Sequence, residues 1–149
     1  MPVRLATASD VSAIRSMLRT HAETEGGSEF AAVPNDELDD ALGGPNPTVR
    51  VTLVTLADEP DVIAGLAMWY PTFSSWSLRN GIWLEDLFVD DAYRGAGLGL
   101  ELMTDLRERT NGRIEWDVSG GNDGAERFYQ RLGAVPLPGW TRYRWLPSE

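Results

Sequence analysis

The stretch from Ile82 to Gly99 constrains the fold of this chain more than any other part of the sequence. It predicts an apolar strand, a short acidic bend, a glycine-rich turn and the start of a helix. Within the strand, Glu85 and Asp86 interrupt a run of Ile, Trp, Leu, Phe and Val. Burying a carboxylate without a partner is costly, so these two residues need either partners or a function.

After the acidic bend the chain runs Arg94-Gly95-Ala96-Gly97-Leu98-Gly99 and opens a helix. Glycines at a helix start leave backbone N–H groups exposed, which suits an anion such as a phosphate. A dinucleotide-binding turn needs a different glycine spacing after a first strand, and a Walker loop needs Gly-Lys-Ser/Thr, which is absent. The stretch therefore indicates a substrate amine, or its proton, handled beside a phosphate-carrying cofactor.

Length and charge limit the class of protein. At 149 residues the chain is expected to form a single domain, residues 1–149. Its net charge of −10 disfavours nucleic acid and anionic membranes as partners. Apolar runs such as residues 62–70 are too short to span a bilayer, and no signal peptide is evident, so a cytoplasmic location is expected. Without cysteine or a second histidine, no metal site is expected.

Periodicity and turn residues predict the order β-α-α-β-β-β-α-β-α-β, a mixed sheet with helices packed on it. Strands are expected at residues 3–6, 49–56, 62–70, 82–89, 113–118 and 140–146. Thr7 and Asp10 predict a capping box for the first helix, which is expected to end by Gly26-Gly27. Residues 71–80 predict a polar loop, and His21, the only histidine, is expected to pack.

The pattern Arg94-x-x-Gly97-x-Gly99 after an apolar strand resembles the acyl-CoA pyrophosphate motif of the GNAT family of N-acetyltransferases. The resemblance continues through Asn122 and Phe128-Tyr129, and the segment 84–89 looks most like the diamine (spermidine/spermine) acetyltransferase branch. It implies an α/β (α+β) fold: a mixed, mostly antiparallel central sheet flanked by helices, with a splayed central strand that binds acyl-CoA.

The resemblance also implies acetyl-CoA as the acyl donor. Backbone amides of the glycine turn, with Arg94, would bind the pyrophosphate, and the pantetheine arm would lie along the central strand. The residues implied in donor binding are Leu87, Phe88, Val89, Arg94, Gly95, Ala96, Gly97, Leu98, Gly99 and Asn122.

Glu85 is the candidate general base and Tyr129 the candidate general acid for the departing thiolate. The alternative for Glu85 is a structural ion pair with an arginine such as Arg142 or Arg144. An apolar setting is expected around Glu85. Strand alternation predicts Asp86 on one face with Leu84 and Phe88, and Glu85 on the other with Trp83 and Leu87, which would keep the two carboxylates apart.

Asp86, Trp76 and Glu25 are candidates for binding the acceptor, which is expected to be a small-molecule primary amine. Relative to the polyamine enzymes, Ser74 or Ser75, Thr24 and Gly121 depart from the expected residues, so an amino acid or an aminoglycoside-like acceptor stays open. A protein or peptide N-acetyltransferase and a non-catalytic acyl-CoA sensor are the alternatives. The resemblance further implies a homodimer, with the final strand and the loop around Trp76 as contacts.

Overall fold

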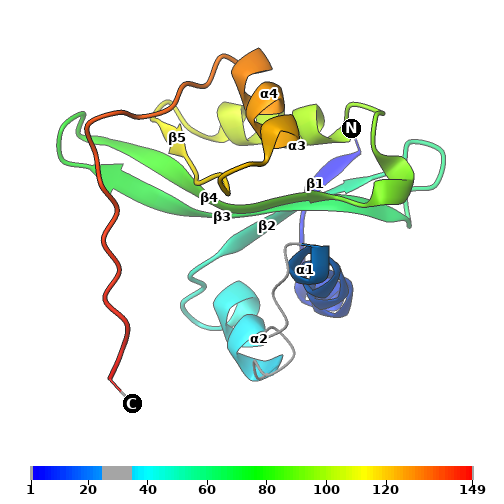
Figure 1. Ribbon diagram of the computed structural model, residues 1–149. Helices are drawn as coiled ribbons and strands as arrows, with labels where there is room; N and C mark the ends of the chain where they lie inside the picture. The colour runs from blue at the N-terminus through cyan, green and yellow to red at the C-terminus, as the bar shows by residue number, and fades with distance from the viewer. Residues whose placement is uncertain (1, 25–34, 149) are drawn as a thin grey trace. The chain divides into compact units, whose positions relative to one another are not determined.

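The computed structural model describes residues 2–24 and 35–148 (Figure 1). The chain divides into two compact units, Met1–Trp116 and Asp117–Glu149. Each unit is described by itself, and a single domain over residues 1–149 stays a prediction. The end of the first helix, predicted at Gly26-Gly27, lies outside the described residues.

The first unit is built on a five-stranded sheet in the order β1-β2-β3-β4-β5. The strands are β1 (Val3–Leu5), β2 (Arg50–Thr55), β3 (Ile63–Ser74), β4 (Arg79–Val89) and β5 (Ile114–Glu115). Neighbours are antiparallel from β1 to β4, whereas β5 runs parallel to β4. The predicted mixed, mostly antiparallel sheet is therefore confirmed.

Helices cover both faces of this sheet. α1 (Val11–Thr24) and α2 (Asn35–Gly43) lie on one face and α3 (Leu98–Arg109) on the other (Figure 1). Apolar residues three and four apart give α1 and α3 one buried side each, which is why they pack there. α1 buries Ile14 and Leu18 against apolar residues of β2 and β3. The buried residues of α3 are Leu98, Leu102, Met103 and Leu106.

The start of α1 is fixed by Asp10. The Thr7 backbone N–H donates to Asp10 Oδ2 at 2.8 Å, so the predicted capping box is confirmed, with a short 3-10 helix η1 (Ala8–Asp10) ahead of α1. The Arg4 guanidinium also donates to both Asp10 oxygens, at 2.8 and 2.9 Å. These Arg4 hydrogen bonds, more than any other cause, lower the pKa of Asp10 to about 2.

The hairpin of β3 and β4 is longer than the sequence predicts. Most of the expected polar loop at residues 71–80 is strand, because pairing continues from Pro71 with Ile82 to Ser74 with Arg79. The turn is short: the Leu78 N–H donates to the Ser74 carbonyl oxygen at 2.8 Å. Pro71 and the serines of this stretch are typical of a loop, so its sequence does not have the residue types that mark a strand.

Two predicted strands differ from the structure at the C-terminal side. Of the strand expected at residues 113–118, only Ile114–Glu115 pairs. The expected strand at residues 140–146 is not formed, since this segment has no regular secondary structure and exposes Trp140, Tyr143 and Trp145. An alternating sequence becomes a strand only when another edge pairs with its backbone. The predicted helix between these segments is confirmed as α4 (Asp123–Arg131).

Candidate active site

A bulge in β4 lies at Glu85. The register steps from Leu84 opposite Trp69 to Asp86 opposite Met68, so Glu85 has no partner on β3. Directly opposed residues share a face, and Trp69 and Met68 are consecutive on β3. Leu84 and Asp86 therefore lie on opposite faces, and the predicted grouping of these two is wrong. Simple alternation no longer separates the two carboxylates.

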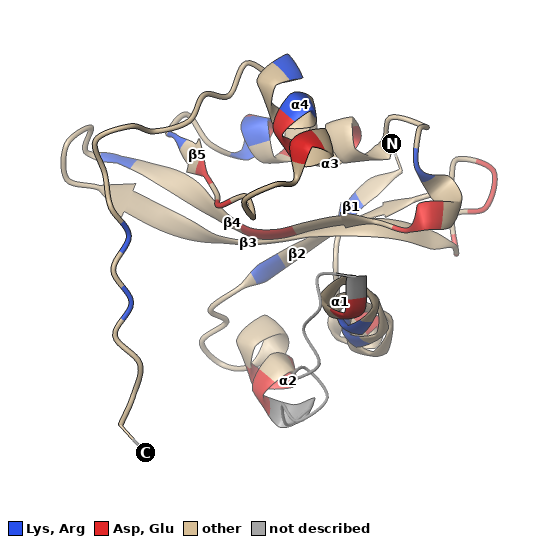
Figure 2. Cartoon of the chain, viewed as in Figure 1, with Lys and Arg blue, Asp and Glu red and all other residues tan. Residues whose placement is uncertain are grey.

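The Glu85 carboxylate is held by an indole. Trp83 Nε1 donates to Glu85 Oε2 at 2.8 Å, and Glu85 is exposed, so the apolar setting expected around it is not observed. Arg142 pairs with Asp117 within the second unit, and the alternative of an ion pair between Glu85 and Arg142 or Arg144 stays a prediction. Figure 2 shows the acidic segment in the middle of β4. Glu85 is thus oriented, and its other oxygen can face solvent or a substrate.

Asp86 is paired with a residue of α1. His21 Nε2 lies 3.3 Å from Asp86 Oδ1, and both side chains are partly exposed. The His21 ring is 5.3 Å from the Phe88 ring, centre to centre. The packing expected for His21 is observed, but the sequence analysis missed its contact with Asp86. The one signal for it was that His21 follows Ile14 and Leu18 at helical spacing on the inner side of α1.

The open edge of β4 lies on its β5 side. β5 pairs with β4 only at Ile82 and Trp83, so along the described chain the segment from Leu84 to Val89 has no strand partner there. Phe88 is buried, whereas Leu87 and Val89 are partly exposed. The predicted splay of the central strand thus corresponds to an unpaired stretch of backbone.

The glycine turn follows directly from this edge. Gly95 and Gly97 have φ values of 85° and 79°, which L-residues rarely adopt, and α3 begins at Leu98. Arg94 Nε donates to the Val89 carbonyl oxygen at 3.2 Å and lies 3.0 Å from Asp91 Oδ1. Residues 94–97 are exposed, so the turn presents its backbone to solvent at the positive end of the helix dipole.

Two further candidates belong to the second unit. Asn122 is the N-cap of α4: its Oδ1 accepts from the Ala125 N–H at 3.2 Å. Tyr129 lies on α4, partly buried, with its ring edge-on to that of Phe128 at 5.3 Å. Their local helix is therefore defined, and their roles toward a ligand stay predictions.

Two candidates for binding the acceptor remain, Trp76 and Glu25. Trp76 is at the tip of the β3–β4 hairpin and is 86% exposed, and its role toward an acceptor stays a prediction. Glu25 lies outside the described residues. In the part of the chain that the structure describes, no three acidic or histidine side chains group as metal ligands do. No described helix is long and apolar enough to cross a membrane.

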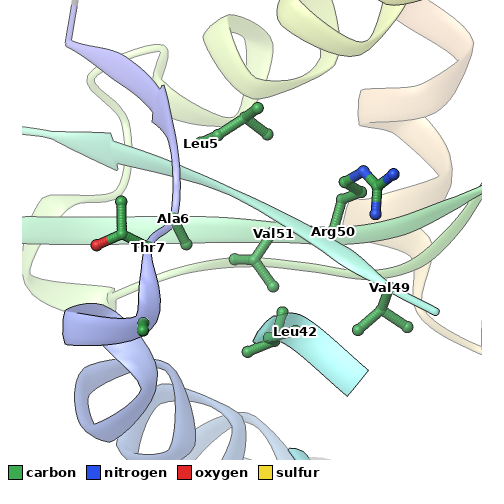
Figure 3. Close-up of a pocket in the computed structure, with 8 residues that line it drawn as sticks. Leu5, Ala6, Thr7, Leu42, Val49, Arg50 and Val51 are labelled. Carbon is green, nitrogen blue, oxygen red and sulfur yellow. The ribbon is translucent and has the colours of Figure 1, made fainter. Parts of the chain in front are cut away.

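A pocket elsewhere in the first unit is separate from these residues. It has a volume of about 90 Å³ and lies where β1 ends, beside α2 and β2. Leu42, Val49 and Val51 gather on one side of β2, and Arg50 points to the other (Figure 3). None of the candidate site residues lines this pocket.

An opened sheet edge that ends in a glycine turn and a helix N-terminus is the arrangement of a domain that binds an extended, phosphate-bearing ligand. The sequence matches the Acetyltransferase (GNAT) family over residues 14–134, and the chain belongs to this family. It is therefore an acetyltransferase of the GNAT type.

Relatives with assigned substrates agree with this family. A mouse thialysine N-epsilon-acetyltransferase is 28% identical, and the match covers 95% of this chain and 90% of the mouse protein. An L-ornithine N5-acetyltransferase of Arabidopsis thaliana is 32% identical over 56% of this chain. The match covers only 38% of the plant protein. A solved structure of a probable acetyltransferase has a TM-score of 0.84 at 20% identity and covers 100% of this chain and 99% of its own. At that identity it supports the fold alone.

Proposed function

We propose that this chain transfers the acetyl group of acetyl-CoA to the primary amine of a small molecule by direct attack. The observation that carries the proposal is the continuity of three features along residues 85–99: an oriented carboxylate, an unpaired strand edge and an exposed glycine turn. A thioester donor with a long arm and a pyrophosphate fits the last two, and an amine that must lose a proton fits the first.

The donor is assigned to the edge and the turn. Backbone N–H groups of Gly95, Ala96, Gly97, Leu98 and Gly99 bind the pyrophosphate together with Arg94. The turn fits this role because a Cβ added to Gly95 or Gly97 would meet nothing within 4 Å, so a ligand can approach the backbone. Main-chain groups of Leu87, Phe88 and Val89 are assigned to the pantetheine arm, and so is Asn122.

Glu85 acts as the general base through a water molecule. The free amine attacks the thioester carbonyl, a C–N bond forms, and the amine proton passes to that water and Glu85. A backbone N–H near Leu87 or Phe88 stabilises the oxyanion. The C–S bond then breaks, and Tyr129 gives its hydroxyl proton to the thiolate. The indole of Trp83 keeps Glu85 oriented for the first step.

The acceptor is a small amine bound near Asp86. Support comes from the acidic segment of β4 and from relatives named for thialysine and ornithine, both of which are amino acids with a side-chain amine. Glu25 and Trp76 are assigned to the same acceptor, with Trp76 lining the pocket of its own chain or that of a partner copy. We also propose that the protein is a cytoplasmic homodimer.

The test is a screen for CoA release from acetyl-CoA with amino acids, diamines, polyamines, aminoglycosides and histone-like peptides. We expect release with small amines. The sequence contains no lysine, so acetyl groups are not lost to side-chain amines of the protein itself. Release with peptides alone would favour a peptide acetyltransferase. Measurable acetyl-CoA binding without release for any acceptor would favour a sensor and overturn the proposal.

A further inference from the structure

One contact at the candidate site has no role in the mechanism above: the pair of His21 and Asp86. Its two atoms, Nε2 and Oδ1, are 3.3 Å apart, and the side chains are 24% and 32% exposed. The pair connects α1 to β4 one residue beyond Glu85, and His21 is the only histidine in the sequence. A pair this accessible to solvent is also accessible to a small cation.

The charge of this pair depends on the proton of His21. With a neutral imidazole, Asp86 carries an uncompensated negative charge. With a protonated imidazole, the pair is neutral, because the imidazolium of His21 balances the charge of the Asp86 carboxylate. Histidine is the side chain whose ordinary charge change falls between pH 5 and 8.

Side chains of α1, β3 and β4 surround the pair of His21 and Asp86. On the same side of the sheet, β3 contributes Met68, opposite Asp86, and Tyr70 two residues on. β4 contributes Phe88, whose ring contacts His21, and the neighbouring carboxylate of Glu85. On α1 the acidic Glu23 follows two residues later. A second ammonium group of an acceptor that reached this surface would compete with the imidazolium for Asp86.

We propose that His21 determines the specificity of the acceptor site by its protonation. In its neutral form it leaves Asp86 to bind the second ammonium group of a diamine. In its protonated form it occupies Asp86, and the site then favours acceptors with a single amine. This inference rests on the proposed function and identifies the class of acceptor that the same site selects.

The test is the ratio of kcat/KM for a diamine to kcat/KM for a monoamine of the same chain length, measured from pH 6 to pH 8.5. The ratio cancels what donor binding, Glu85 and Tyr129 contribute equally to both acceptors. In the wild type we expect the ratio to rise with pH by about threefold to fivefold, the size of a partly exposed ion pair.

Variants separate His21 from its surroundings. In His21→Gln the ratio should be high and should lose the pH dependence of the wild type. In Asp86→Asn it should be low and equally flat. Arg19→Gln is the matched control, because it removes a positive charge from the exposed side of α1, two residues away, and should keep the wild-type profile. Thermal unfolding and acetyl-CoA titration show whether each variant is folded.

A wild-type ratio that does not change with pH would overturn the proposal, and this result needs no variant. A pH dependence retained in His21→Gln or in Asp86→Asn would overturn it as well. These results differ from the failure of the proposed function itself, in which the wild type would bind acetyl-CoA but acetylate neither amine. In that case the proposed role of His21 would be wrong as well.

Discussion

At the scale of single residues, the candidate site depends on contacts that could not be predicted from the sequence. Glu85 was recognisable because a carboxylate in an apolar strand is unusual. Its indole partner was not, because Trp83 is an ordinary strand residue until the geometry brings its N–H to the carboxylate. The same holds for His21 and Asp86, which are 65 positions apart. Residue type points to chemistry, whereas the pairing of residues depends on the fold.

Glu85→Gln is expected to lower kcat by about a hundredfold to ten-thousandfold, the usual contribution of a general base. The amide keeps the size of the side chain and can still accept from Trp83, so the dissociation constant of acetyl-CoA should be unchanged. Steady-state kinetics and calorimetry measure the two quantities. Wild-type turnover in this variant would contradict the assignment of Glu85.

Tyr129→Phe removes the proposed acid and keeps the ring that packs on Phe128. We expect turnover to fall far more than acetyl-CoA binding weakens, because the hydroxyl acts on the leaving thiolate only after the donor is bound. Replacing Phe128 by Leu is the matched control for packing. If Tyr129→Phe turns over as fast as the wild type, Tyr129 is not the acid.

Asp10→Asn tests the network at the start of α1. The Arg4 hydrogen bonds hold the pKa of Asp10 near 2 in the folded state, below about 3.9 in an unfolded chain. A lowered pKa stabilises the fold at pH values above the unfolded pKa, and this contribution is lost as pH falls toward 2. Urea unfolding should show the variant about 2 kcal/mol less stable at pH 7 and nearly equal to the wild type at pH 2. A pH-independent difference would contradict this.

At the scale of elements, the sequence predicted the helices and the order of the elements along the chain better than the strand lengths. Helices α1 and α3 have clear apolar spacing, and α4 is capped by Asn122, so the positions of these helices follow from local sequence. The bulge at Glu85 could not be predicted, because register is a property of β3 and β4 together. The longer hairpin and the absence of the strand predicted at residues 140–146 have the same cause. Whether a segment forms a strand depends on whether the edge of another strand pairs with its backbone.

Gly99→Ala separates the helix from the proposed donor site. Gly99 is the second residue of α3, where alanine is favoured over glycine by about 0.5 to 1 kcal/mol, so the variant should unfold at a slightly higher temperature. A methyl group there should crowd a bound pyrophosphate, and we expect the dissociation constant of acetyl-CoA to rise by at least about fivefold.

The control for this variant is Gly43→Ala at the end of α2, where an added Cβ meets nothing within 4 Å. It should leave acetyl-CoA binding unchanged. Unchanged affinity in Gly99→Ala would show that the start of α3 does not contact the donor.

At the scale of the whole molecule, several large aromatic side chains are exposed. Trp140 is 69% exposed, Tyr143 92% and Trp145 98%, and Trp76 is exposed at the hairpin tip. Large apolar side chains gathered on one segment are typical of an interface. The sequence predicted this segment as a strand, and a second copy is the partner that the homodimer proposal supplies.

Replacing Trp140 and Trp145 together by Ser is expected to convert a dimer to a monomer in sedimentation velocity, because both side chains would lose buried area at the interface. Trp76→Ser is the comparison for the hairpin contact. Loss of the dimer in Trp76→Ser alone would place the interface there. A monomeric wild type at all concentrations would rule out the homodimer.

The positive φ values in the glycine turn affect how its glycines are interpreted. Gly95 and Gly97 have positive φ values and open space around the missing Cβ, so a D-alanine would fit both positions where an L-alanine strains the backbone. Chirality alone therefore demands glycine at these two sites, whether or not a phosphate ever arrives. Gly99 lies within α3, where the backbone makes no such demand. The glycine that the backbone does not require is the one that most directly reports on a ligand.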